Sequence, residues 1–96
     1  MPSGAKSPPP APVQLHLAAN LRRLRKARAL TQDGLAELLS LSPRYVRSLE
    51  SGSVNVDLRR LQAIADGLGV EPASLLRPAK LAPPRVGRPP GRSRRP

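Results

Sequence analysis

Apolar and polar residues alternate with a helical period along the middle of the chain. Leu17, Leu21 and Leu24 recur at i, i+4 and i+7, which predicts an amphipathic helix over 13–29. Shorter helices are predicted from Thr31 to Leu39, from Ser42 to Glu50 and from 57 to 68, and Pro72 opens a fifth turn. The inward faces are expected to hold Leu35, Leu38 and Leu39 in the second helix, Val46 and Leu49 in the third, and Leu58, Leu61, Ile64, Ala65 and Leu68 in the fourth.

Residues that begin and end helices divide this pattern. Thr31, Ser42 and Asp57 are N-cap types, because their side-chain oxygens can accept from free backbone N–H groups. Pro43 would occupy the first helical position after Ser42, where no backbone donor is lost. Gly69 is placed to end the fourth helix in the left-handed conformation. We therefore expect an all-α, compact five-helix domain.

The two ends of the chain have a different composition from the middle. Of thirteen prolines, only Pro43 and Pro72 lie within 14–76. We expect a disordered Pro-rich arm over 1–13, one helical domain over 14–76 and a disordered basic tail over 77–96. The spacing of Pro9 and Pro12 also fits a PxxP ligand, although a solvated leader is favoured. With one Tyr and no Phe or Trp, the core must be aliphatic.

Positive charge indicates the kind of partner. The formal net charge is +11, from 17 Lys and Arg against 6 Asp and Glu. A basic domain with a basic arm favours a polyanion, and the arm has no aromatic residue that would insert into a membrane. Without cysteine and with one histidine, no metal site or cofactor is expected. No apolar run is long enough for a signal peptide or a membrane span, so we expect a cytoplasmic protein.

The second and third predicted helices, joined by a three-residue break, have the geometry that places a helix in the DNA major groove. If Val46 and Leu49 face the core, the outward face of the third helix consists of Pro43, Arg44, Arg47 and Ser48. Arg44 and Arg47 could each donate bidentate hydrogen bonds to guanine. The alternative is that both arginines only solvate a surface helix.

Several spaced motifs match one family pattern. They are Leu21-Arg22 with Arg25, Thr31-Gln32, Leu35-Ala36, Glu50 with Gly52, and Leu68-Gly69-Val70. Over roughly 17–76 the chain thus resembles the Cro and lambda-repressor-like (XRE) helix-turn-helix family. The resemblance implies binding to double-stranded DNA, usually as a two-fold homodimer.

The resemblance also implies roles for individual residues. Arg44, Arg47, Ser48 and Pro43 would read bases, while Gln32, Ser42 and Tyr45 would contact the DNA backbone. Tyr45 could instead pack its ring over the edge of the core. Arg25 and Glu50 would form a buried ion pair between the first helix and the end of the third.

Some positions depart from the family pattern. Ala29 and Ser40 stand where glycine is usual, so each would be mildly strained if its φ is positive. Gly34 replaces the Glu that would complete a capping box after Thr31, and Val56 replaces a proline. These departures bear on local stability more than on the fold.

The combined hypothesis is a transcriptional regulator that represses at a palindromic operator. Alternatives are an antitoxin-type regulator that also binds a partner protein, a restriction–modification controller, and an architectural protein that binds through its tail. The tail motif Gly87-Arg88-Pro89 resembles an AT-hook core, although a nonspecific polycationic arm is favoured.

The dimer surface is expected near Leu75-Leu76 and the end of the fourth helix. We do not expect an enzyme, because the chain is too small and has too few ionisable groups to form a catalytic pocket.

Overall fold

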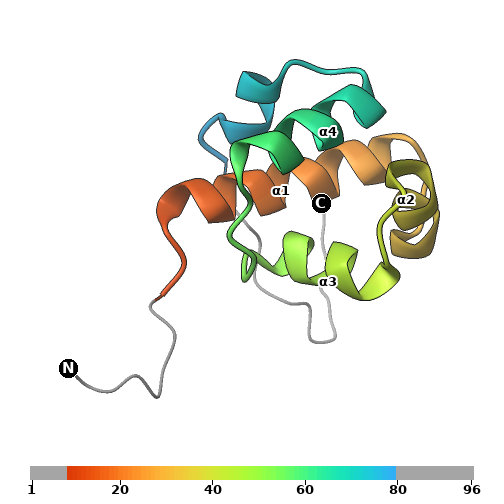
Figure 1. The fold of residues 1–96 in the computed structure, drawn as a ribbon, viewed down its shortest axis with the longest axis horizontal. Helices are drawn as coiled ribbons and strands as arrows, with labels where there is room; N and C mark the ends of the chain where they lie inside the picture. The colour runs from red at the N-terminus through yellow and green to blue at the C-terminus, as the bar shows by residue number, and fades with distance from the viewer. Residues whose placement is uncertain (1–8, 80–96) are drawn as a thin grey trace, which may run out of the picture.

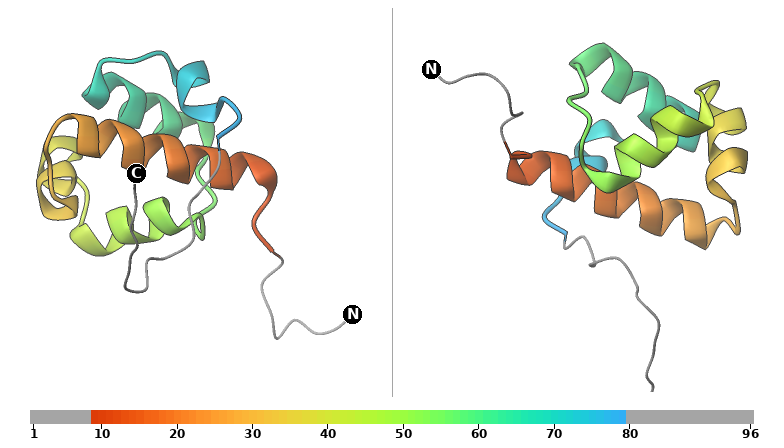
Figure 2. Two further views of the ribbon diagram at one scale, coloured as in Figure 1. Left: turned by 180° about the vertical axis from the view of Figure 1, so that it is seen from behind. Right: turned by 90° about the horizontal axis from the view of Figure 1, so that it is seen from below.

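A long first helix forms the axis of the domain in the computed structural model, which describes residues 9–79 (Figure 1). This helix, α1 (Pro12–Ala27), has α3 (Pro43–Ser51) on one side and α4 (Leu58–Leu68) on the other. Helix α2 (Gln32–Leu39) closes one end and packs on α3 and α4. The view from behind in Figure 2 shows the same order, with the short 3-10 helix η1 (Pro72–Leu76) against α1 and α4. The all-helical prediction is confirmed, with the fifth element a 3-10 turn.

The predicted N-caps of α2, α3 and α4 are all present. The side chain of Thr31 accepts from the N–H of Gly34 at 2.9 Å, and that of Ser42 from the N–H of Tyr45 at 3.0 Å. Asp57 accepts from the N–H of the third residue after it at 2.7 Å. These bonds satisfy donors that a helix start otherwise leaves free, which explains why local sequence alone located the three starts.

Hydrogen bonds to residues of α1 hold both ends of the described part of the chain. The helix begins at Pro12, and the side chain of Gln14 both accepts from the N–H of Ala11 at 2.8 Å and donates to the carbonyl of Val54 at 3.1 Å. At the other end, the buried amide of Asn20 donates to the carbonyls of Leu75 and Arg77. The N–H of Ala79 donates to Nδ1 of His16 at 3.0 Å. Residues 77–79 therefore pack with the domain.

The core is aliphatic, as predicted, and consists of Leu17, Leu21, Leu35, Ala36, Val46, Leu49, Leu61, Ile64, Ala65, Leu68 and Leu75. Two leucines expected to face inward are exposed instead: Leu38 retains 46% and Leu58 81% of its surface. Leu58 shares the apolar stripe of α4, but it is the first residue of the helix and lies beyond the edge of the core. Leu38 is exposed because α2 buries the other side of its short cylinder, through Leu35 and Ala36.

Both suspected glycine positions adopt positive φ without being glycine. Ala29 has φ of 56° and Ser40 has φ of 57°. An L-residue in this conformation costs about 1–2 kcal/mol, partly offset because glycine loses more backbone entropy on folding. The predicted strain is therefore present at both helix ends.

Replacing Ala29 or Ser40 by glycine is expected to raise the free energy of unfolding by about 0.5–1 kcal/mol, as relief of the strain exceeds the entropy that glycine loses. Urea denaturation measures the change. Ala63→Gly is the matched control, because Ala63 lies within α4, where glycine costs about 1 kcal/mol. A loss of stability at 29 and 40 as large as at 63 would contradict the prediction.

Candidate nucleic-acid interface

A three-residue turn, 40–42, sets the angle between α2 and α3. Ser40 takes the left-handed conformation that ends α2, and the N–H of Leu41 then donates to the carbonyl of Ala36 at 2.9 Å. Ser42 follows in an extended conformation and caps α3. The turn is thus held by backbone hydrogen bonds on one side and by a side-chain cap on the other.

Helix α3 has the two faces that the sequence predicts. Val46 and Leu49 are 0% and 2% exposed, so they hold the helix against the core. Pro43, Arg44 and Arg47 are exposed on the other face, while Ser48 is half-buried. The structure therefore brings three of the four expected base-reading residues together on open surface.

A buried carboxylate joins the first three helices. Arg25 of α1 donates from Nε to Oε2 of Glu50 at 2.7 Å, and the two side chains are 13% and 2% exposed. Gln32 of α2 donates from Nε2 to Oε1 of the same carboxylate at 3.1 Å. Arg25 also donates to the carbonyl of Leu30 at 2.9 Å. Each oxygen of Glu50 thus has its own donor, as a charge in the interior requires.

The bond from Gln32 was not anticipated from the sequence. Gln32 is the first residue of α2, as expected, but its half-buried side chain uses the amide donor on Glu50. A glutamine beside a buried carboxylate is a natural second donor. Only the packing of α2 against the end of α3 shows that the two residues are neighbours.

The two outward arginines differ in their surroundings. Arg47 lies 4.0 Å from Asp33 of α2, with both side chains largely exposed at 57% and 77%. An exposed pair at this distance is worth about 0–1 kcal/mol, so Arg47 can exchange Asp33 for another acceptor at little cost. Arg44 has no ion pair with any residue of 9–79. Both guanidinium groups are therefore accessible to an anionic partner.

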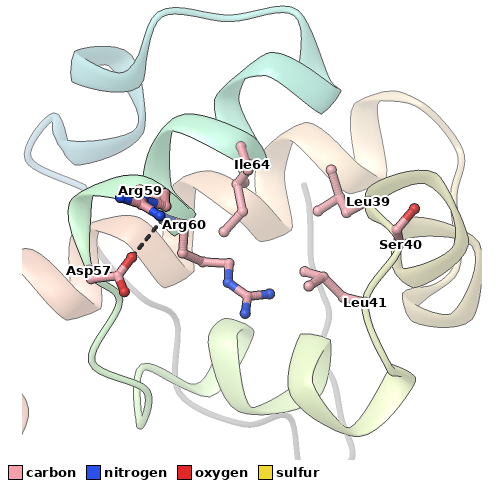
Figure 3. A pocket seen from close by; sticks show the side chains of 8 residues that line it. Leu39, Ser40, Leu41, Asp57, Arg59, Arg60 and Ile64 are labelled. Carbon is pink, nitrogen blue, oxygen red and sulfur yellow. Dashed lines mark hydrogen bonds between the residues drawn. The ribbon is translucent and has the colours of Figure 1, made fainter.

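Tyr45 packs at the edge of the core and is half-buried. The guanidinium carbon of Arg60 lies 5.1 Å from the centre of the Tyr45 ring, within the range of a cation–π contact. Arg60 also lines a hollow of about 240 Å³ between the turn and α4 (Figure 3). Its walls are Leu39, Ser40 and Leu41 on one side and Asp57, Arg59, Arg60, Ala63 and Ile64 on the other. The ring thus packs on the domain.

Within 9–79 no group of three or more His, Cys, Asp or Glu side chains is close enough to hold a metal ion. In the same part of the chain, no helix is long and apolar enough to cross a bilayer.

The family of the chain follows from comparison with known proteins. The profile of the helix-turn-helix family matches residues 21–75, which is more than half of the chain. The chain belongs to the helix-turn-helix family. The matched range begins within α1 and ends in η1, so this helix-turn-helix domain includes the turn, α3 and the carboxylate of Glu50.

Similar proteins include regulators of several kinds. The immunity repressor protein of Bacillus phage phi105 is 36% identical over 56 residues, which are 58% of this chain and 39% of the repressor. Control protein C.MunI of a Mycoplasma species is 34% identical over 59 residues, 60% of this chain and 80% of that protein. The restriction-modification controller protein C.AhdI of Aeromonas hydrophila has a solved structure, with a TM-score of 0.60 and 37% identity over 65% of this chain and 94% of that one.

Family and geometry agree on the general function. The chain carries the fold of helix-turn-helix regulators and presents two accessible arginines on the outward face of α3. The protein is a DNA-binding transcriptional regulator.

Proposed function

We propose that the protein represses transcription by binding a palindromic operator as a homodimer, with α3 in the major groove. The observation that carries this proposal is the two-faced character of α3. Its inward face is fixed by Val46, Leu49 and Glu50, while Arg44 and Arg47 extend from the exposed face without a buried partner. Arginine side chains on a helix presented in this way can donate hydrogen bonds to O6 and N7 of guanine.

The base-reading set is Arg44, Arg47, Ser48 and Pro43. Arg44 and Pro43 lie in the first turn of α3, and Arg47 follows Arg44 at i+3. The N-terminal turns of a recognition helix enter the groove deepest. Ser48 is half-buried, so its part would be limited to a base at the edge of the site.

Backbone contacts are assigned to Gln32, Ser42 and Tyr45. Because the Gln32 amide is engaged with Glu50, its phosphate contact would come from the main-chain N–H at the start of α2. The Ser42 oxygen accepts from the helix, which leaves its O–H to donate to a phosphate. Tyr45, with its ring covered by Arg60, would use its hydroxyl.

A second candidate function is control of restriction–modification genes. It is favoured by coverage: the chain spans 80% and 94% of the two controller proteins but only 39% of the phage repressor. An antitoxin-type regulator with a partner protein has no comparable support. In each case the protein would act in the cytoplasm, at the nucleoid when bound.

Selection of bound sites from random duplex DNA tests the proposed function. The expected result is a palindrome whose half-sites are about 10 base pairs apart from centre to centre, because two α3 helices must enter successive major grooves. A pool without sequence preference would contradict operator binding and favour an architectural role. A single, asymmetric half-site would contradict the homodimer.

The basic tail is expected to add affinity without specificity. Residues 80–96 contain Lys80, Arg85, Arg88, Arg92, Arg94 and Arg95 and no acidic residue, and they lie outside the described part of the chain. Deleting 80–96, while keeping residues 77–79 that pack on α1, should weaken binding to all duplexes similarly. The slope of log K against log salt should fall by about 0.9 for every phosphate that the tail neutralises in the complex.

Fluorescence anisotropy titrations at several salt concentrations measure this effect. An unchanged slope would show that the tail neutralises no phosphate in the complex. A weakening confined to A·T-rich duplexes would instead support the AT-hook at Gly87-Arg88-Pro89.

A further inference from the structure

The end of the domain opposite α2 carries exposed apolar side chains. We call this surface the apolar end; it consists of Val13, Val54, Val56, Leu58 and Leu76. Val13 is 44% and Leu58 81% exposed, while the other three are half-buried. Figures 1 and 2 show why they meet: the start of α1, the loop after α3 and the start of α4 all lie at this end.

A hollow of about 180 Å³ opens among these side chains. Gln14, Leu17, Asn55 and Leu61 complete its walls, so none of its lining residues is charged. Pockets for small molecules usually measure about 300–1,000 Å³, which is larger than this hollow. An apolar side chain suits its size and lining better than a metabolite does.

We propose that two copies of the chain associate through the apolar end, with Leu58 of each copy packed against the hollow of the other. This inference rests on the proposed function, which requires a homodimer. A two-fold interface uses the same patch on both copies, so the patch must be complementary to itself. The apolar end meets this condition because it has both a projecting leucine and an uncharged hollow beside it.

The distribution of charge also favours the apolar end as the interface between two copies. Each copy has a formal net charge of +11, so most approaches of one copy to another are repulsive. The hollow beside the turn, in contrast, is lined by Arg59 and Arg60. The lining of the hollow at the apolar end is uncharged, so an apolar side chain of a second copy can enter it without meeting a charge there, and interface cores are depleted of charged residues.

The position of α3 suits this pairing. Helix α3 runs along one edge of the domain toward the apolar end, and Ser53–Val56 follow directly from its last turn (Figure 1). A two-fold axis that passes through this end and points toward the α3 side of the domain would place both α3 helices on the same side of the pair, as a palindrome requires. Of the residues near the surface expected from the sequence, Leu75 is 0% and Leu68 2% exposed, while Leu76 is half-buried and lines the apolar end.

The test compares Leu58→Glu with the matched control Leu38→Glu in the full chain. Both residues are exposed leucines on helices, and both substitutions change the net charge by the same amount. Sedimentation equilibrium is expected to show that Leu58→Glu raises the dimer dissociation constant at least about 100-fold, because the two-fold symmetry removes a buried leucine from both copies. Leu38→Glu should leave it within about threefold of wild type.

Thermal melts monitored by circular dichroism check that both variants fold. The proposal is overturned if wild type is monomeric with and without DNA, or if Leu58→Glu dimerises as wild type does. It is also overturned if removing 1–8 or 80–96 is needed before Leu58→Glu has an effect, since one of those segments would then cover the apolar end. A covalent dimer on oxidation of Leu58→Cys, but not of Leu38→Cys, would support it; the chain has no other cysteine.

Binding to DNA separates failure of this inference from failure of the proposed function. Leu58→Glu should bind a duplex with one half-site as wild type does and lose only the cooperative gain on the palindrome. If no operator is found but Leu58→Glu still dissociates the dimer, the proposed function fails and the apolar end stands. If the operator is found and Leu58→Glu binds it cooperatively, the proposed function stands and the inference about the apolar end fails.

Discussion

Replacing Glu50 by alanine is expected to lower the free energy of unfolding by about 3–5 kcal/mol, a large share of the roughly 5–15 kcal/mol that stabilises a domain. The substitution leaves the guanidinium of Arg25 buried without its carboxylate and removes the acceptor of Gln32. Urea denaturation followed by circular dichroism measures the change.

Glu37→Ala is the matched control, since Glu37 is an exposed glutamate on α2. It should change stability by no more than about 0.5 kcal/mol. The double variant Arg25→Met/Glu50→Leu should be more stable than Glu50→Ala, because it removes both charges together. Equal destabilisation by Glu37→Ala and Glu50→Ala would refute the importance of the buried carboxylate.

Replacing Arg44 and Arg47 together by alanine is expected to abolish base preference while leaving nonspecific DNA binding. Each arginine should contribute about 1–3 kcal/mol on the selected site, through bidentate hydrogen bonds in the major groove. Both side chains are exposed, so the fold should be preserved. Titrations against the selected site and its single-base variants at fixed salt measure the effect.

The control variant replaces Arg22 and Arg23 of α1 by alanine, which removes the same charge from another part of the domain. It should weaken binding to all duplexes evenly or leave it unchanged, because these side chains could reach only phosphates, which carry no sequence information. If the variant of Arg44 and Arg47 keeps its base preference, α3 is not the recognition helix.

Features set by neighbouring residues were predictable from the sequence. Thr31, Ser42 and Asp57 cap helices through bonds to an N–H three residues further on, so their effect needs no knowledge of the fold. The positive φ of Ala29 and Ser40 was predictable from a family pattern that has glycine there. The pairing of Arg25 with Glu50 also followed from the family pattern, not from spacing alone.

Features set by contacts between helices were not predictable. The apolar period of α4 includes Leu58, but periodicity does not show where the core ends. Within α3 itself, the only acidic residue near Arg47 in sequence is Glu50. In the structure, Asp33 approaches Arg47 from α2. The amide of Gln32 and the ring of Tyr45 likewise have partners on other helices. Such partners depend on the angles between helices, which the sequence pattern does not specify.

The carboxylate of Glu50 also bears on the thermodynamics of DNA recognition. By joining α1, α2 and the end of α3, it holds α3 in one orientation in the free domain. A preorganised surface loses little conformational entropy on association, so more of the interaction energy remains as affinity. The heat-capacity change of binding should then match the area buried at the interface, without the excess that accompanies folding coupled to binding.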